Sequence, residues 1–394
     1  MKFKKVFLKD ISIKNRGAYG IGASAVDFNE KLPKYLRITD INDDGSINFL
    51  ELKSVDDKNY QKYILKENDI VFARTGNSTG KNYFYNPADG ELVYAGFLIK
   101  FSLNPEKVFP EYVKYYCMSS EYWGWVGGFS SGSTRKNINA KIYGELPLFL
   151  PSVENQKKIV NILNPLSKRI DINQKIIITL EEIVETLFNH WFINFEFPDK
   201  KGNPYKSNGG KMIESELGEI PGGWEVKNLG DLVTFEYGKA LKKENRLNGK
   251  YPVYGSGGVV GYHNEYLIKG PSIIVGRKGT VGSIYYSEEN SFPIDTTFWI
   301  KPKLENLSMG FTLLILKNQD FSNLISDSAV PGLNRNVAYQ NKVIFPAEKI
   351  MLEFNAINDS LLKNINSLKK ENETLKELRD TLLPKLLSGE IELE

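Results

Sequence analysis

Cysteine and histidine are scarce in this chain, and their scarcity limits the chemistry it can perform. The 394 residues include one cysteine and two histidines. A single cysteine, Cys117, excludes a disulfide framework and a thiolate metal cluster, so we expect it to be a small buried hydrophobic residue. His190 and His263 lie far apart in the sequence. This separation argues against a histidine-based metal site and leaves few options for general-base catalysis.

Long apolar runs are absent as well. The longest, near Ile176 and Leu313, are much shorter than the roughly 20 residues that span a bilayer. The N-terminal Met-Lys-Phe-Lys-Lys is not followed by the apolar core of a signal peptide. The content of 41% hydrophobic and 25% charged residues is ordinary for a globular protein, and the length suits two or three domains. We therefore expect a cytoplasmic protein with no membrane partner.

The sequence also lacks the common catalytic and cofactor motifs. The segment Gly76–Asn82 resembles a phosphate loop, but it has too few residues between its glycines and Asn82 where Ser or Thr would bind magnesium. Gly255–Gly261 misses the dinucleotide-binding spacing by one residue. Asn203-Pro204-Tyr205 lacks one proline of the amino-methyltransferase motif. We find no Ser-His-Asp set, metal cluster or convincing carboxylate pair in the sequence, which favours a binding protein over an enzyme.

What the chain does contain is a repeat. Residues 1–190 and 213–388 each run from a strand-rich, Gly- and aromatic-rich segment into a long helical pattern. Three short segments of the first half match three of the second: Val6–Ile11 with Lys227–Leu232, Asp69–Gly76 with Ser272–Gly279, and Ser133–Ile138 with Gly332–Val337. A period near 200 residues is too long for a solenoid. It predicts two copies of one module related by a pseudo-twofold axis.

Each half ends in apolar residues spaced alternately three and four apart, which is typical of a coiled-coil seam. In the first half these residues are Ile159, Leu163, Leu166, Ile170, Asn173, Ile177, Leu180, Val184 and Leu187. In the second they are Ile350, Phe354, Ile357, Leu361, Asn364, Leu368, Glu371, Leu375 and Leu378. We expect the two helices to pair antiparallel. Asn173 and Asn364 are each the fifth seam position, so we expect them to lie near each other and to set the register.

Proline and glycine mark the boundaries between these parts. Ser152 is the predicted N-cap of the first helix. The stretch after this helix, residues 194–223, is rich in Pro, Gly and polar residues. The predicted parts are head one (1–151), a long helix (152–193), a linker (194–223), head two (224–346), a second long helix (347–388) and a tail (389–394).

The loops of both heads place basic residues among Gly, Ser, Thr and Asn. Arg and Lys bind guanine edges and phosphates, Asn binds adenine, and Ser or Thr holds phosphates. The same residues also make ordinary turns between strands. Their recurrence at matching places favours DNA binding, and the candidate residues are Arg74, Asn77, Ser78, Lys81, Ser133, Arg135, Lys136, Asn137, Ser256, Arg277, Lys278, Asn334 and Arg335.

Three longer segments carry a family resemblance. They are Gly144–Val160, where head one meets its helix, the central stretch Phe197–Trp224, and the C-terminal Leu378–Ile391 with its Leu-Leu-Pro-Lys-Leu-Leu-Ser-Gly-Glu-Ile sequence. On these segments the chain resembles the specificity (S) subunit of a type I restriction-modification system along essentially its whole length. The match between the heads is weaker at Thr75, which replaces Lys278, and at Asn77, which looks inserted.

The resemblance implies an α+β fold: two mixed α/β target-recognition domains joined by two long antiparallel coiled-coil helices. Each head would recognise one half of a bipartite double-stranded DNA site, and the helices would set the spacer. The helices would also dock two modification (methyltransferase) subunits, and restriction (translocase) subunits would join the full complex. S-adenosylmethionine would be bound by the modification subunits, so we expect no cofactor and no catalytic residue in this chain.

Two other classes of function stay open at this point. One is a coiled-coil scaffold whose heads bind carbohydrate or protein, and the other is a stand-alone enzyme. DNA binding that weakens with salt through counterion release would separate the first alternative from the DNA-binding function. Methyl transfer by the chain alone would support the second. The sequence does not reveal the target bases, because DNA readout depends on loop placement and DNA shape.

Overall fold

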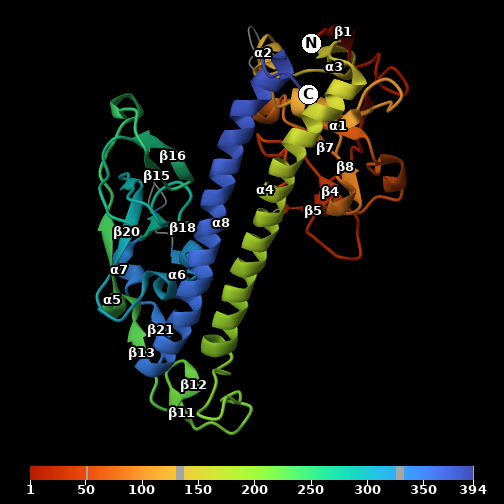
Figure 1. The fold of residues 1–394 in the computed structure, drawn as a ribbon. Helices are drawn as coiled ribbons and strands as arrows, with labels where there is room; N and C mark the ends of the chain where they lie inside the picture. The colour runs from red at the N-terminus through yellow and green to blue at the C-terminus, as the bar shows by residue number, and fades with distance from the viewer. Residues whose placement is uncertain (50–51, 130–136, 325–331, 394) are drawn as a thin grey trace. The chain divides into compact units, whose positions relative to one another are not determined.

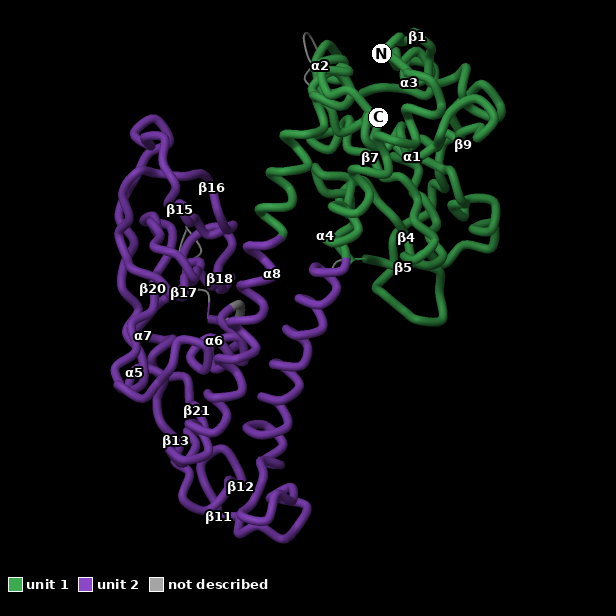
Figure 2. The backbone as a smooth tube through the Cα atoms, viewed as in Figure 1, with its two compact units in different colours: residues 1–171, 372–394 green, residues 172–371 purple. Residues whose placement is uncertain are grey.

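The structure is a computed structural model that describes residues 1–49, 52–129, 137–324 and 332–393. Two compact units divide the chain, as Figure 2 shows in green and purple. Unit 1 holds residues 1–171 and 372–394, and unit 2 holds residues 172–371. Each unit thus combines one head with parts of both long helices. Among the described residues, no helix is long and apolar enough to cross a membrane.

Head one is built from short strands in two four-stranded sheets and one pair. Its strands are β1 (Lys4–Phe7), β2 (Ala18–Tyr19), β3 (Ala25–Val26), β4 (Lys34–Leu36), β5 (Lys53–Val55), β6 (Asp69–Ala73), β7 (Asn82–Phe84), β8 (Leu92–Tyr94), β9 (Leu98–Ser102) and β10 (Pro147–Leu150). Its helices are α1 (Pro110–Tyr116), α2 (Ser120–Gly127) and α3 (Ala140–Gly144). The sheet orders are β2-β9-β6-β7, β3-β5-β4-β8 and β1-β10.

Head two repeats this plan. Its elements are β13 (Glu225–Asn228), α5 (Leu229–Leu232), β14 (Val233–Tyr237), β15 (Tyr251–Gly255), β16 (Gly258–His263), β17 (Ser272–Gly276), β18 (Ile284–Ser287), β19 (Phe292–Pro293), β20 (Thr297–Pro302), α6 (Met309–Lys317), α7 (Arg335–Ala338) and β21 (Lys342–Phe345). The sheet orders are β14-β20-β17-β18, β16-β15-β19 and β13-β21. These orders match head one, including the parallel pairs β4–β8 and β15–β19, except that the edge strand β3 has no counterpart in head two. The predicted duplication is confirmed at the level of topology.

The strand next to the candidate site is fully buried in each head. All five residues of β6 (Asp-Ile-Val-Phe-Ala) and of β17 (Ser-Ile-Ile-Val-Gly) are buried, as expected for β-branched and aromatic runs in the middle of a sheet. Ser119 caps α2 by accepting from the Tyr122 N–H, and Ser308 caps α6 by accepting from the Phe311 N–H. These caps satisfy N–H groups that a helix leaves without partners.

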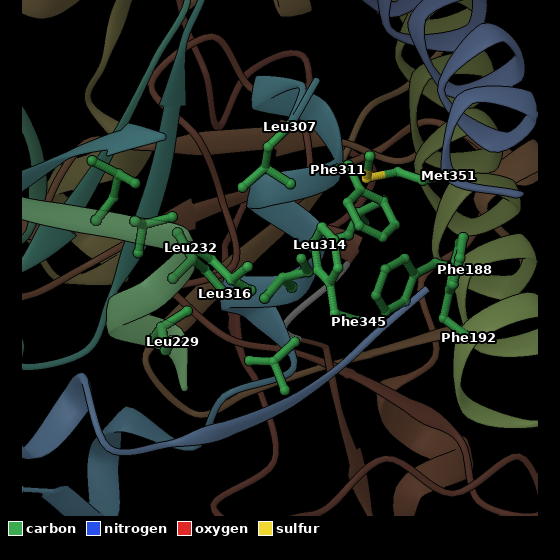
Figure 3. Close-up of a cluster of buried hydrophobic side chains, with 14 of the residues drawn as sticks. Phe188, Phe192, Leu229, Leu232, Leu307, Phe311, Leu314, Leu316, Phe345 and Met351 are labelled. Atoms are coloured by element: carbon green, nitrogen blue, oxygen red, sulfur yellow. The ribbon is translucent and has the colours of Figure 1, made fainter. Parts of the chain in front are cut away.

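The two heads complete their cores with different parts of the long helices. The head-one core includes Leu383 and Leu386 near the C-terminus, together with Leu163. The head-two core instead includes aromatic residues from both helices, such as Phe354 and Phe188, the latter labelled in Figure 3. In Figure 3 the Phe311 side chain of α6 lies in this cluster, and its ring centroid is 5.8 Å from that of Phe188. Cys117 is buried in the head-one core, as predicted.

The long helices are α4 (Val153–Phe188) and α8 (Glu348–Ser388), which Figure 1 shows in yellow-green and blue. The Asn155 N–H donates to the Ser152 hydroxyl, so Ser152 caps α4 as predicted. In unit 1 the amide of Asn372 donates to the Ile170 carbonyl at 3.4 Å. In unit 2 Lys369 forms an ion pair with Glu181 at 2.9 Å. Partner numbers rise along α4 as they fall along α8, so the helices run antiparallel, as predicted.

The predicted seam describes α4 well and α8 only in part. All nine predicted α4 positions are buried or half-buried. On α8, Phe354 is buried and Leu361, Leu368 and Leu375 are half-buried. Ile357, Asn364 and Leu378, however, are exposed. The buried heptad column lies one residue further along the helix, at Met351, Asn358, Ile365, Asn372, Arg379 and Leu386. The prediction was wrong for this column because polar residues occupy half of the buried positions, and a pattern built on apolar residues passes over them.

The expected pairing of Asn173 with Asn364 is also wrong. Asn173 is fully buried, whereas Asn364 is exposed. Near Asn173, the α8 residue that contacts α4 is Asn372, whose amide bonds to the Ile170 carbonyl. Asn372 lies about two helical turns after Asn364. The seam does carry asparagines that can define its register, and on α8 they are Asn358 and Asn372.

The stretch predicted as a linker has its own ordered structure within unit 2. A π-helical turn (Asn189–Ile193) follows α4, and β11 (Met212–Ser215) pairs with β12 (Gly218–Pro221) as a hairpin. The rings of Phe197 and Trp224 stack with centroids 5.1 Å apart, and both side chains are buried. Glycine and proline mark turns here, but the aromatic residues among them supply a core that the turn pattern does not reveal.

Candidate nucleic-acid interface

The two candidate arginines occupy the same position in the two heads. Arg74 follows β6, and Arg277 follows β17. The Arg74 N–H donates to the Phe97 carbonyl at 3.0 Å, and the Arg277 N–H donates to the Thr296 carbonyl at 2.9 Å. The carbonyls of these arginines accept in turn from the N–H groups of Ile138 and Leu333, respectively. Two equivalent backbone hydrogen bonds therefore hold each arginine at the edge of its sheet.

Each arginine lies against a tyrosine that the sequence pattern did not predict as part of the site. The guanidinium carbon of Arg74 is 5.1 Å from the ring centroid of Tyr19, and that of Arg277 is 4.9 Å from the ring of Tyr237. Both tyrosines end the first strand of the corresponding sheet and are more than 40% exposed. Cation–π contact orients each guanidinium, and both arginines are half-buried beside these exposed rings. We name these pairs the Arg–Tyr sites.

The glycine after each tyrosine is required by the backbone. A Cβ atom on Gly20 would lie 2.2 Å from the Ala95 carbonyl oxygen, and one on Gly238 would lie 2.1 Å from the Ile294 carbonyl oxygen. The chain can leave the sheet beside the arginine only because no side chain is present. The repeated Tyr-Gly dipeptide was the available sequence signal, and it was missed because most tyrosines in strand-like runs serve packing.

The structure corrects one of the three repeat matches. Two matches are confirmed, because the strands at Val6 and Asp69 pair as those at Lys227 and Ser272 do. In the third, Thr75 bridges Asn137 and Lys278 bridges Gly332, so Gly332 corresponds to Asn137 and not to Ser133. The match was wrong by four residues, because the basic residues were aligned instead of the helix caps.

With the corrected register, Asn139 and Asn334 are equivalent N-caps. The Asn139 side chain accepts from the Ile142 N–H, and the Asn334 side chain accepts from the Asn336 N–H. Asn334 therefore has a structural role as a cap of α7, and Arg335 has no basic counterpart in head one, where Ala140 follows Asn139. Asn137 is exposed beside Thr75. Ser133, Arg135 and Lys136 lie outside the described residues.

Arg335 adds a second guanidinium to the site of head two. Its guanidinium carbon is 4.8 Å from the Tyr237 ring centroid, and its Nη1 donates to the Phe235 carbonyl at 3.4 Å. Arg277 donates from its own Nη1 to the Asp295 carbonyl at 3.1 Å. The structure thus brings together Arg277 and Arg335, which are 58 residues apart in sequence, on one tyrosine ring. Two positive charges at one exposed position suit an anionic or guanine-bearing ligand.

The remaining candidates of head one lie on the loop that follows Arg74. Asn77 is exposed and Ser78 is half-buried. Lys81 forms an ion pair with Asp43 at 3.0 Å, which satisfies part of its charge within head one. This loop has six residues between Arg74 and Lys81, whereas the matching loop of head two has five between Arg277 and Ser283. The expected insertion at Asn77 is therefore confirmed, and Lys81 corresponds to Ser283.

In head two, Lys278 and Ser256 lie at the site. Lys278 is exposed directly after Arg277. The Ser256 carbonyl, at the turn between β15 and β16, accepts from the Ser283 hydroxyl at 2.6 Å and the Tyr285 hydroxyl at 3.2 Å. The turn therefore packs directly on the loop that carries Lys278. Head one replaces this two-residue turn with residues 37–52 between β4 and β5.

That longer connection carries a strongly perturbed carboxylate. Burial alone would raise the pKa of Asp44, but hydrogen bonds from Ser46 and the positive charge of Lys376 lower the pKa to about 2. The Lys376 Nζ lies 3.0 Å from the Asp44 carboxylate. Asp44 thus attaches the connection to α8 within unit 1. Among the described residues, no group of three or more His, Cys, Asp or Glu side chains is placed to hold a metal ion.

Comparison with known proteins follows the same division of the chain. Residues 1–182 and 221–377 match the family model described as the type I restriction modification DNA specificity domain. The HindI specificity subunit of a type I restriction enzyme from Haemophilus influenzae is 27% identical over 84% of this chain and 88% of its own length. The MjaIX specificity subunit from Methanocaldococcus jannaschii is 28% identical over 73% of this chain and 70% of its own.

A solved structure has the same fold. It is the crystal structure of a type I restriction-modification S subunit from M. genitalium, with a TM-score of 0.55 and 20% sequence identity. The alignment covers 98% of this chain and 96% of that one. The likeness extends through both heads and both long helices, in agreement with the α+β architecture expected from the sequence.

Proposed function

The chain belongs to the type I restriction-modification DNA specificity family, and we propose that its two Arg–Tyr sites are where it reads a bipartite DNA sequence. The chain acts in DNA sequence specificity, as its family does. In this proposal, Arg74 of head one reads one half-site. Arg277 and Arg335 of head two read the other. Arginine is suited to this task because its guanidinium binds guanine O6 and N7 with two parallel hydrogen bonds.

One observation carries this assignment: the same arginine is held against the same tyrosine by the same backbone hydrogen bonds in both heads. A pair of arginines kept only for packing would have its N–H groups directed into the core. Here the tyrosines are exposed, and so are Lys278 and Asn77 on the loops that follow the arginines. A rigid backbone frame that holds a half-buried guanidinium at the edge of its sheet is the arrangement that base recognition requires.

The partners follow from the family and from the helices. We propose that α4 and α8 dock two modification subunits, which bind S-adenosylmethionine and transfer the methyl group, and that restriction subunits join this complex on DNA. The chain itself would be non-catalytic and would work in the cytoplasm. Exposed apolar residues on both helices, among them Ile176, Ile183 and Ile357, are available for such contacts.

Substitution of each arginine tests the assignment. The full-length chain is assembled with its modification subunits, and methylated bases are mapped in genomic DNA for the wild type, Arg74→Ala and Arg277→Ala. We expect each substitution to weaken binding to its own half-site by about 1–3 kcal/mol and to relax sequence preference there only. Lys201→Ala, on an exposed side chain away from both sites, serves as the control.

Two outcomes would contradict the assignment. If both half-sites lose specificity together in either variant, the two heads do not read separately. If neither variant changes the methylated sequence or the affinity, the Arg–Tyr sites do not contact DNA bases, and other loops of the heads must do so.

A further inference from the structure

One segment of head two has a charge that neither the fold nor the Arg–Tyr site accounts for. Residues 238–250 connect β14 to β15 and read Gly-Lys-Ala-Leu-Lys-Lys-Glu-Asn-Arg-Leu-Asn-Gly-Lys. Five of these thirteen residues are basic and only Glu244 is acidic. We call this stretch the basic segment. The four lysines in it, Lys239, Lys242, Lys243 and Lys250, are all exposed.

The basic segment begins at the Arg–Tyr site. It starts at Gly238, directly after Tyr237, and it leads into β15, whose far end is the Ser256 turn beside Lys278. The Lys239 N–H donates to the Pro293 carbonyl at 3.1 Å. Pro293 is two residues from Asp295, whose carbonyl accepts from the Arg277 guanidinium. The first lysine of the segment therefore lies close to the residue that we assign to base reading.

The segment is held in place rather than loosely attached. Arg246 donates from Nη1 to the Val260 carbonyl of β16 at 2.7 Å. The Leu247 N–H donates to Nδ1 of His263 at 3.0 Å, and His263 is buried. Gly249 lies directly against the Asn264 backbone. Arg246 and His263 thus serve as anchors, and the lysines are presented along the edge of the β15–β16 hairpin.

The charges of the lysines are not neutralised within the protein. Within the described part of the chain, none of the four lysines forms an ion pair. By contrast, Lys81 at the site of head one pairs with Asp43, and Lys53 pairs with Asp27 at 2.8 Å. Four exposed and unpaired positive charges on one anchored segment raise the local positive potential, which attracts an anionic partner.

The matching segment of head one has the opposite character. Residues 20–33 lie between β2 and β4, the strands equivalent to β14 and β15. This stretch contains one basic residue, Lys31, and two acidic residues, Asp27 and Glu30. Its exposed side chains include Phe28, at 53%. The basic segment is therefore a property of head two alone and not of the shared module.

We propose that the basic segment binds the phosphate backbone of DNA next to the half-site of head two and supplies most of the sequence-independent affinity of the chain. Lysine ammonium groups act as point charges toward phosphates and carry no base preference of their own. Head two then attaches to DNA of any sequence through this segment, and head one engages when both half-sites are in register. This inference rests on the proposed function, because it assigns the surface next to the base-reading site.

A charge-matched pair of variants tests the proposal. The test variant is Lys239→Gln/Lys242→Gln/Lys243→Gln/Lys250→Gln. The control is Lys200→Gln/Lys201→Gln/Lys206→Gln/Lys211→Gln, which removes four exposed lysines from the stretch between α4 and head two of the same unit. Affinity of the full-length chain with its modification subunits is measured at graded salt for the target duplex and for a duplex lacking both half-sites.

We expect the test variant to lose affinity for both duplexes by the same factor. The slope of log affinity against log salt should fall by about 0.9 for each lysine that contacts a phosphate, and the methylated sequence should not change. The control should keep the wild-type slope.

The proposal is overturned if the test variant keeps the wild-type slope, or if it loses affinity only for the target duplex. A wild-type slope in the test variant, together with altered half-site preference in Arg277→Ala, would overturn this inference and leave the proposed function intact. If the wild-type complex shows no salt-dependent DNA binding at all, both fail.

Discussion

The two heads hold an arginine in the same backbone frame and surround it with different chemistry. In head one, Arg74 lies between two exposed aromatic rings, those of Tyr19 and Phe97. In head two, Arg277 and Arg335 share Tyr237, and Thr296 replaces Phe97. The frame depends on backbone hydrogen bonds, which most side-chain substitutions leave intact. The side chains around each arginine can therefore differ between the heads without loss of the fold. Two duplicated recognition domains need this property if each is to bind a different half-site.

A second difference lies in how each head closes its core. Leu386, near the C-terminus, belongs to the head-one core, so residues far apart in sequence complete a domain that begins at the N-terminus. Met351 occupies the same heptad column of α8 and belongs to the head-two core. One helix thus contributes to both cores from the same heptad column. A substitution at Leu386 can be compared with one at Met351 to show whether the two cores are separate.

The largest expected effect comes from this pair. Leu386→Ala should destabilise unit 1, and Met351→Ala should destabilise unit 2, each by about 2–5 kcal/mol, because both side chains are buried to within 1% of full burial. Hydrogen exchange resolved by peptide measures the two units separately. Exposed Leu378→Ala, on the same helix, should change neither by more than about 0.5 kcal/mol. Equal loss of protection in both units from one substitution would show that the two cores are not separate.

The next effect concerns the glycines of the Arg–Tyr sites. Gly238→Ala should cost about 2–3 kcal/mol of stability in head two, because the new Cβ would lie 2.1 Å from a carbonyl oxygen. Gly20→Ala should have a similar cost in head one. Gly257→Ala is the control, because no heavy atom lies within 4 Å of its Cβ position. Denaturant unfolding gives the comparison, and a Gly238→Ala protein as stable as Gly257→Ala would contradict the close approach.

The acid response should differ between the units. Asp44 has a pKa lowered to about 2, below its usual value in unfolded chains, so its contribution is present above about pH 4. As pH falls from about 4 to about 2, unit 1 should lose about 2 kcal/mol of stability from this group. Asp44→Asn should remove that part of the acid dependence and lower the stability of unit 1 at neutral pH. An unchanged pH profile of unit 1 in this variant would show that the contact with Lys376 contributes nothing.

The smallest expected effect tests the tyrosines directly. Tyr237→Leu should weaken DNA binding by about 1–2 kcal/mol, since two guanidiniums lose their shared ring, and Tyr19→Leu should cost about half as much. Tyr237→Phe keeps the ring and should stay close to wild type. The salt slope should be unchanged in all three, because no charge is removed. If Tyr237→Phe is as weak as Tyr237→Leu, the hydroxyl and not the ring is what matters.

Much of this architecture could be predicted from the sequence because its signals are local or repeated. The heptad of α4, the cap at Ser152 and the strands at Asp69 and Ser272 all depend on neighbouring residues. The sequence predicts Arg74 and Arg277 as site residues because they recur at equivalent places in the two heads. A duplicated sequence effectively supplies a second observation of every position, which is why turn-like loops could be distinguished as candidate sites.

Tertiary structure alone decided which residues meet. Tyr19 and Tyr237 join the sites only because β2 and β14 pair with β9 and β20, a long-range contact with no local pattern. The buried column of α8 contains Asn358, Asn372 and Arg379, so apolar periodicity selected the adjacent column. The register of Asn137 against Gly332 depends on single bridges at the ends of strands. In each case the outcome is set by packing and hydrogen bonds between distant segments, whose free energies depend on geometry that no short stretch of sequence contains.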